Sequence, residues 1–245
     1  MHFFDVRDKI LRGFDIFAKD VVFIYRSIRI VITLCSLFFS FLLLHVAAMP
    51  AWSMSAMEFY QLALKHQDIN AFGATCQSAH ETGWWTSKLW RTANNGAGIK
   101  AGKDWRGQGK PAVNHVSPEA VGNQLVYRTS YFRSYSDAED FMRDYRNKIV
   151  RDYPHSARNS DTVWGYFAGL QKGRYGSWAT SQNYYRQMVG KAFKLAPSLL
   201  GLEWRAKLLA DYHEAKKRNA LKPWQADIIR KNLMASGLGA EINYP

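Results

Sequence analysis

The sequence predicts a mainly helical domain with a small antiparallel β-lobe, preceded by one N-terminal transmembrane helix. Three observations support this fold class. A run of about 20 residues from Ile30 to Met49 has no charged side chain, which is enough to span a bilayer as a helix. After it, stretches with the helical spacing of apolar residues alternate with turns rich in Gly and Asn. Between Gly96 and Arg133 this spacing gives way to the alternation that is typical of strands.

The first element is predicted to be a membrane anchor. Basic residues precede the apolar run at Arg7, Lys9, Arg12, Lys19, Arg26 and Arg29, and none follows it between Pro50 and Met57. This asymmetry places the N-terminus in the cytoplasm and the rest of the chain outside it, in the periplasm or the extracellular space. We therefore expect a cytoplasmic amphipathic segment at 1–27 and a single-pass anchor at 28–49. Small residues such as Ala47 and Ala51 leave a cleaved signal peptide open as an alternative.

The composition limits the classes of partner that the chain is expected to bind. Lys and Arg number 33 against 20 Asp and Glu, for a formal net charge of +13. An acidic partner is expected, which could be nucleic acid, a membrane surface or a bacterial wall. The basic residues are scattered along the chain, so we predict no nucleic-acid partner. The two cysteines, Cys35 and Cys76, lie in different segments and predict no internal disulfide, and no metal-ligand spacing or cofactor motif is present.

Residues 54–195 are predicted to form the main domain. Ser55 with Glu58 makes a capping box that starts a helix, and a second helix is expected from Ala71 to Thr82, stopped by Gly83. Glu81 therefore lies at the end of a buried helix, beside Trp84 and Trp85. A carboxyl group at the edge of an apolar cavity loses solvation, so its pKa should rise and a proton should be available near neutral pH.

The remaining elements follow from the same signals. Alternation at Val113–Val116 and Gln124–Phe132 predicts an antiparallel hairpin. A helix should begin at Ser136 with Glu139 as its capping partner. Further helices are expected at Asp161–Leu170 and Asn183–Leu195, followed by a C-terminal helical extension at 196–245 that contains Leu202–Ala220 and Pro223–Ala235. The sequence indicates no function for this extension.

Several motifs together resemble the glucosaminidase family, glycoside hydrolase family 73. They are the runs Gln77–Trp84, Ser87–Leu89, Asn94–Lys100, Phe132–Ser136 and Trp178–Thr180, the last one preceding Tyr184. The resemblance covers about residues 57–194. It implies a lysozyme-like α-lobe with a small β-lobe. It also implies a peptidoglycan hydrolase of the endo-β-N-acetylglucosaminidase type, which cleaves β-1,4 glycosidic bonds of the glycan strand without a cofactor or a metal.

The same resemblance assigns roles to particular residues. Glu81 matches the family's catalytic acid. A second carboxylate is expected across the cleft, and Glu119 ranks above Asp104 for that role. The implied substrate-binding residues are Trp84, Asn95, Lys100, Trp178, Tyr184 and Tyr175. Ordinary roles compete at several of these positions, because Asn95 could simply hold a Gly-rich turn and the tryptophans could simply pack.

Two departures from the family pattern leave alternatives open. Gly96-Ala97 replaces the usual leucine-phenylalanine pair, and Trp178 stands where a tyrosine is common. Tyr175 or Tyr184 could supply the missing hydroxyl, or Trp178 could act only as a stacking surface under a sugar. A non-catalytic, membrane-anchored wall-binding or assembly protein, and a lytic transglycosylase, are therefore the competing functions. An envelope-spanning machine or a viral assembly would be a suitable setting for either an enzyme or a binding protein.

Overall fold

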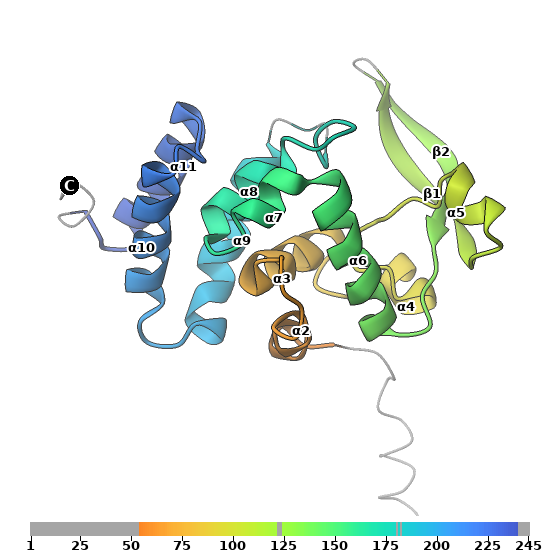
Figure 1. Cartoon of the computed structure of the whole chain (residues 1–245), viewed down its shortest axis with the longest axis horizontal. Helices are drawn as coiled ribbons and strands as arrows, with labels where there is room; N and C mark the ends of the chain where they lie inside the picture. Colours follow the sequence, from red (N-terminus) through yellow and green to blue (C-terminus); the bar gives the residue numbers. More distant parts are fainter. Residues whose placement is uncertain (1–53, 122–123, 180, 182, 240–245) are drawn as a thin grey trace, which may run out of the picture. The chain divides into compact units, whose positions relative to one another are not determined.

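The computed structural model describes residues 54–121, 124–179, 181 and 183–239. The predicted cytoplasmic segment at 1–27 and the predicted anchor at 28–49 lie outside these residues. Within the described ranges every helix is too short or too polar to cross a bilayer. The elements, labelled in Figure 1, are α2 (Ala56–Ala63), α3 (Ala71–Glu81), α4 (Lys88–Ala93), α5 (Lys103–Gly107), β1 (Ala112–Val121), β2 (Gln124–Arg133), α6 (Ala138–Asp152), α7 (Pro154–Arg158), α8 (Val163–Leu170), α9 (Tyr184–Leu199), α10 (Trp204–Lys217) and α11 (Pro223–Ala235).

The first two helices begin and end as the sequence predicts. The Ser55 hydroxyl accepts from the Glu58 amide at 3.2 Å, and the Glu58 carboxylate accepts from the Ser55 amide at 2.7 Å, which confirms the capping box. Asn70 caps α3 by accepting from the Gly73 amide at 2.7 Å. The last residue of α3 is Glu81, and eight of its eleven residues are buried. The catalytic candidate is thus attached to a helix that is anchored in the core.

The predicted start of α6 was wrong by one residue. Asp137, not Ser136, is the N-cap, and its carboxylate accepts from the Asp140 amide at 2.8 Å. Glu139 does not close a capping box and instead pairs with His66 at 2.9 Å. Both serine and aspartate are favourable caps, so the residue types alone do not choose between adjacent positions.

The two strands form an antiparallel hairpin, as predicted, although β1 continues five residues beyond the predicted Val116. Val113 pairs with Phe132 in the register of the hairpin. Phe132 is buried against Leu89 and Ala93 of α4, in a small apolar cluster separate from the main core. The base of the hairpin is therefore attached to the helical region through α4.

The main core surrounds α3, α8 and α9. Helix α3 packs against α2 and α9, and every residue of α8 is buried (Figure 1). Trp164 of α8 is fully buried, stacks on Phe193 with ring centroids 5.8 Å apart, and donates its indole N–H to the Leu208 carbonyl at 2.9 Å. A core built around these helices fixes the end of α3, where Glu81 lies.

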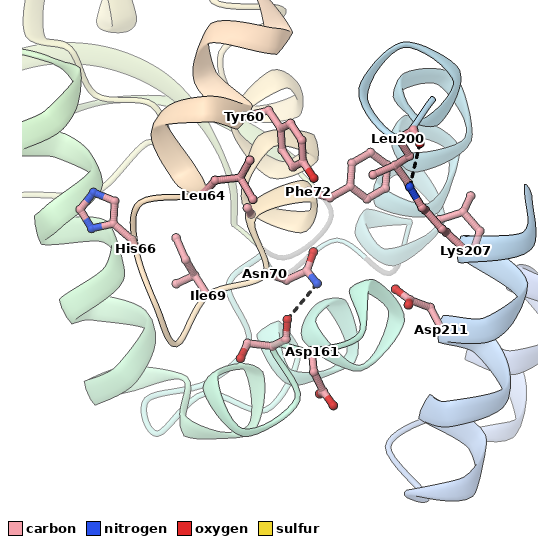
Figure 2. A pocket seen from close by; sticks show the side chains of 13 residues that line it. Tyr60, Leu64, His66, Ile69, Asn70, Phe72, Asp161, Leu200, Lys207 and Asp211 are labelled. Atoms are coloured by element: carbon pink, nitrogen blue, oxygen red, sulfur yellow. Dashed lines mark hydrogen bonds between the residues drawn. The ribbon is translucent and has the colours of Figure 1, made fainter. Parts of the chain in front are cut away.

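The C-terminal helices dock onto this core. Asp211 of α10 accepts from the Val163 amide at 2.7 Å and so caps the N-terminus of α8. Trp224 of α11 packs edge-on against Tyr185 at 5.4 Å. Figure 2 shows Asp211 and Lys207 of α10 facing Phe72 across a pocket of about 340 Å³. The extension predicted from the sequence thus packs on the domain, with α11 bounded as predicted and α10 shorter than predicted.

Candidate active site

Glu81 carries a partly buried carboxyl group at the C-terminal end of α3. Burial raises its pKa from 4.5 to about 7, although hydrogen bonds from Tyr184 and Trp178 act in the opposite direction. This confirms the direction expected from the sequence. Within the described residues no Lys or Arg forms an ion pair with Glu81, so the group can exchange a proton near neutral pH.

The two oxygens of this carboxyl group have different surroundings. Oε1 accepts from the Tyr184 hydroxyl at 2.9 Å and from the Trp178 indole N–H at 3.1 Å. Oε2 has no hydrogen-bond partner among the described residues. A Cβ built on Gly98 would lie 3.8 Å from Oε2, and Gly98 has a left-handed φ of +58°. Oε2 therefore faces a glycine that has no side chain to cover it.

Asn95 holds the turn that places Gly98 there. Its side-chain amide donates to the carbonyls of Ile99 and Arg133, both at 2.9 Å, and its oxygen accepts from the Ile99 amide at 2.9 Å. Asn95 is only 1% exposed. Of the two roles left open by the sequence, the geometry supports the turn-holding one. Lys100 follows this turn, is exposed, and forms an isolated β-bridge with Phe132.

Trp178 donates a hydrogen bond where the family pattern has a tyrosine. Its amide is fixed to the Leu170 carbonyl at 2.9 Å, and its ring contacts those of Tyr153 at 5.1 Å and Tyr145 at 6.0 Å. The indole N–H is aimed at Glu81. From the sequence, Trp178 was expected at most to stack under a sugar, and its role as a hydrogen-bond donor to Glu81 was not predicted. The side chains of tyrosine and tryptophan can both donate a hydrogen bond, so the replacement of the family's tyrosine by Trp178 could have indicated a donor at this position.

Of the two tyrosines that could replace the family's hydroxyl group, Tyr184 directs its hydroxyl at Glu81 and Tyr175 does not. Tyr184 begins α9, is buried, and bonds to Glu81. Tyr175 is 82% exposed and lines a groove of about 370 Å³ that also contains Asp104 and Trp105. The structure thus joins Glu81, Trp178 and Tyr184 in one cluster.

Behind Tyr184 lies a set of buried polar groups that the sequence analysis did not identify. Gln77 donates to the Tyr184 hydroxyl at 3.0 Å, the Tyr145 hydroxyl donates to Gln77 at 2.5 Å, and Tyr145 and Tyr166 share a hydrogen bond of 2.6 Å. One signal was present in the sequence. Gln77 lies four residues before Glu81, on the same side of a helix whose neighbours are apolar or small.

The two tryptophans after Glu81 lie in different places. Trp85 is 3% exposed, donates to Ser78 at 2.9 Å and packs against Phe59, so it belongs to the core. The ring of Trp84 lies under the ammonium groups of Lys191 and Lys194, at 4.1 and 4.6 Å from its centroid. Sugar stacking by Trp84 stays a prediction.

The second carboxylate is not part of the described cluster. Glu119 lies in β1, opposite Val126. Asp104 lies in the short helix α5 and is exposed. Trp105, the next residue in α5, has Arg133 and Lys110 over its ring at 4.3 and 4.7 Å. The role of Glu119 stays a prediction.

A comparison with protein families gives the identity of the domain. The family model Glucosaminidase, described as mannosyl-glycoprotein endo-beta-N-acetylglucosaminidase, matches residues 57–194, more than half of the chain. The chain belongs to the glucosaminidase family. This glucosaminidase is accordingly a glycoside hydrolase, and its helical region with a two-stranded sheet is the arrangement that the resemblance implies.

Solved structures of several wall enzymes are similar to this glucosaminidase. An N-acetylmuramoyl-L-alanine amidase from Staphylococcus aureus is 23% identical over 58% of this chain and 39% of that one, with a TM-score of 0.46. A peptidoglycan hydrolase from Sphingomonas sp. A1 is 26% identical over 64% and 91%, at 0.42. The glycoside hydrolase domain of Salmonella typhimurium FlgJ is 21% identical over 68% and 99%, at 0.44. No curated protein matches the chain.

Proposed function

We propose that this protein hydrolyses β-1,4 glycosidic bonds of peptidoglycan as an endo-β-N-acetylglucosaminidase, with Glu81 as the general acid. The observation that carries the proposal is the state of the Glu81 carboxyl group. Its pKa is about 7, one oxygen accepts from two donors, and the other faces Gly98. Such a group holds a proton on a substantial fraction of molecules at neutral pH and can transfer it to a leaving oxygen.

The chemistry follows from this arrangement. Glu81 gives its proton to the glycosidic oxygen while the bond from that oxygen to the anomeric carbon breaks, and positive charge develops on the sugar. The resulting Glu81 carboxylate is stabilised by the donors Tyr184 and Trp178. Water attacks the anomeric carbon, and in an inverting reaction a second group takes its proton. Glu119 of the hairpin is our candidate for that group, with Asp104 as the alternative.

The substrate class is inferred from charge and predicted location. The net charge of +13 suits an anionic wall polymer, and the predicted single-pass anchor would hold the domain in the periplasm or outside the cell, close to that polymer. Lys100 and Trp178, which are exposed and partly exposed, are our candidates for substrate contacts. Tyr184 was also predicted from the sequence to bind substrate, but it is only 3% exposed and contacts Glu81 instead. A tethered hydrolase of this kind would open the wall locally for an envelope-spanning or viral assembly.

The test is zymography of the full chain on purified murein, followed by mass spectrometry of the soluble products. We expect clearing by the wild type and reducing N-acetylglucosamine ends. Glu81→Gln should lower the rate by about a thousandfold, because it cannot donate an acidic proton. Glu203→Gln, which changes an exposed carboxylate at the start of α10, is the matched control and should be fully active.

The other outcomes identify the competing functions. Anhydro-muramic ends would indicate a lytic transglycosylase. Binding of murein without clearing, equal for the wild type and Glu81→Gln, would indicate a wall-binding protein.

A further inference from the structure

Four buried side chains from four helices form a continuous hydrogen-bonded chain that ends on Glu81. They are Gln77 of α3, Tyr145 of α6, Tyr166 of α8 and Tyr184 of α9, and each is at most 3% exposed. The contacts run from Tyr166 to Tyr145 (2.6 Å), Gln77 (2.5 Å), Tyr184 (3.0 Å) and the Oε1 atom of Glu81 (2.9 Å). Buried polar networks of this kind are stabilising only when every member is satisfied.

The direction of each hydrogen bond in this chain can be assigned from its length. An O–H donor reaches an oxygen at 2.5–3.0 Å, whereas an N–H donor requires roughly 2.7–3.2 Å. The 2.5 Å contact between Tyr145 and Gln77 therefore suits the tyrosine hydroxyl donating to the amide oxygen. The amide nitrogen of Gln77 is then on the other side, where its 3.0 Å contact makes it a donor to Tyr184.

The remaining protons are determined by this assignment. A hydroxyl group has a single proton. Tyr145 uses its proton toward Gln77, so Tyr166 must donate to Tyr145. Tyr184 accepts from Gln77, and its hydroxyl has Oε1 of Glu81 as its one other hydrogen-bond partner among the described residues, so its own proton points there. All bonds in the chain are thus oriented toward Glu81.

We infer that Gln77, Tyr145 and Tyr166 are positioning residues that keep the acidic proton of Glu81 on Oε2. This rests on the proposed role of Glu81. Oε1 accepts two hydrogen bonds, one from the Tyr184 hydroxyl and one from the indole N–H of Trp178, which can act only as a donor. A proton placed on Oε1 would meet these donor hydrogens. If Tyr184 were free to rotate, its oxygen could accept a proton from Oε1, and the acid would then be directed into the protein instead of toward Gly98.

The groups that face this network leave Glu81 as the one that titrates around pH 7. Burial raises the pKa of Tyr153 to about 12 and those of Tyr145 and Tyr184 well above their usual range, so these phenols stay protonated. Tyr166 shifts in the same direction for the same reason.

Two basic groups also lie close to the network. The His80 ring lies 5.5 Å from that of Tyr184, and burial together with Lys191 lowers its pKa, so it is neutral at pH 7. The ammonium group of Lys148 lies 5.7 Å from the Trp178 ring. A pH profile above pH 7 therefore reports on Glu81.

The test compares Tyr145→Phe and Gln77→Met with a matched control, all in the full chain. Tyr145→Phe removes one oxygen and frees the Gln77 amide to turn. Gln77→Met keeps the length of the side chain and removes both of its hydrogen bonds. We expect each to lower kcat on murein about fivefold at unchanged KM, because Gln77 and Tyr145 are buried and cannot contact the substrate. The basic limb of the kcat profile should also move to higher pH, because Oε1 is no longer held by an oriented donor.

Tyr185→Phe is the control. Tyr185 is also a buried tyrosine at the start of α9, but its hydroxyl has no hydrogen-bond partner in the described structure. Removing the Tyr185 hydroxyl should change neither kcat nor the basic limb of the kcat profile. The inference is overturned if Tyr145→Phe and Gln77→Met melt at lower temperature yet keep the wild-type kcat and pH limb, since the network would then serve stability alone.

A second readout does not depend on activity. Isotope-edited infrared titration of the Glu81 carboxyl, assigned by its loss in Glu81→Gln, should show a higher midpoint in Tyr145→Phe than in the wild type. If the wild type proves inactive on murein but this difference is found, the proposed function fails and the oriented chain stands. If murein is cleaved through Glu81 but the midpoints coincide, the chain fails and the proposed function stands.

Discussion

The helical region around Glu81 and the β1–β2 hairpin are held in place in different ways. Glu81 ends a buried helix and is fixed by hydrogen bonds that reach into the main core. The hairpin is attached through a small cluster around Phe132, and its outer residues are exposed, with Val116 at 56% and Tyr127 at 70%. A segment with few buried apolar contacts opens at lower free-energy cost than a core helix. The acid is therefore preorganised, whereas any group that the hairpin contributes depends on a less supported element.

The largest effect expected in the helical region around Glu81 is a change in the free energy of unfolding. The folded state raises the pKa of Glu81 from 4.5 to about 7, so the proton stabilises the folded protein. This contribution is complete below pH 4.5 and is lost as the pH rises through 7. At pH 8 the free energy of unfolding of Glu81→Gln should be about 3 kcal/mol larger than that of the wild type. At pH 4 the two free energies should be equal. Urea denaturation at both pH values measures this, and equal stability at pH 8 would contradict the burial of the charge.

The contribution of the hairpin is tested by comparing Glu119 of β1 with Asp104 of α5. If Glu119 handles the attacking water, Glu119→Gln should lower kcat about a hundredfold, because general base catalysis is lost. Asp104→Asn should leave the rate unchanged. Initial rates of reducing-end release from murein distinguish these variants. A large loss in Asp104→Asn with full activity in Glu119→Gln would reverse the assignment, and full activity in both would exclude these two carboxylates from the chemistry.

Gly98 is the residue of the Asn95 turn that lies next to Oε2 of Glu81. Gly98→Ala forces a side chain into a left-handed backbone, which costs about 1–2 kcal/mol, and places a methyl group near Oε2. We expect kcat to fall by ten- to a hundredfold, more than the loss of stability explains. Gly109→Ala is the matched control, because Gly109 also has a left-handed φ, at +68°, and its added Cβ would meet nothing within 4 Å. Equal rates for both variants would mean that Oε2 is not the working oxygen.

Tyr184→Phe should have the smallest effect of this series. It removes one of two donors to Oε1, so the carboxylate is less stabilised and the pKa of Glu81 rises further. We expect a loss of kcat of about tenfold and a basic limb about one pH unit higher. Profiles of kcat between pH 5 and 9 measure both quantities, and a limb that moves to lower pH would be inconsistent with a hydroxyl that donates to Oε1.

The comparison between the two regions also separates what the sequence could predict from what it could not. Helix ends at Ser55 and Pro223 follow from local signals and agree with the structure. The raised pKa of Glu81 follows from its place at the end of a buried helix. The partners of Gln77 lie 68 and 107 residues away, so no local pattern could reveal them.

Backbone geometry determines where the tryptophan side chains lie. Trp84 and Trp85 both have a left-handed φ, at 65° and 59°, and these turns send the two side chains to different places. The sequence placed both beside Glu81, because residue types alone do not show such turns. The family pattern identifies Trp178 as a residue near the site, but only the folded structure shows that its indole N–H is directed at Oε1 of Glu81.

The proposed chemistry requires Glu81 to hold its proton near neutral pH. A ¹³C NMR titration of the glutamate carboxyl carbons in the full chain tests it directly, with the Glu81 resonance assigned by its absence in Glu81→Gln. The structure predicts a midpoint at about pH 7, matching the basic limb of the kcat profile. A midpoint near the ordinary value of 4.5 would contradict it.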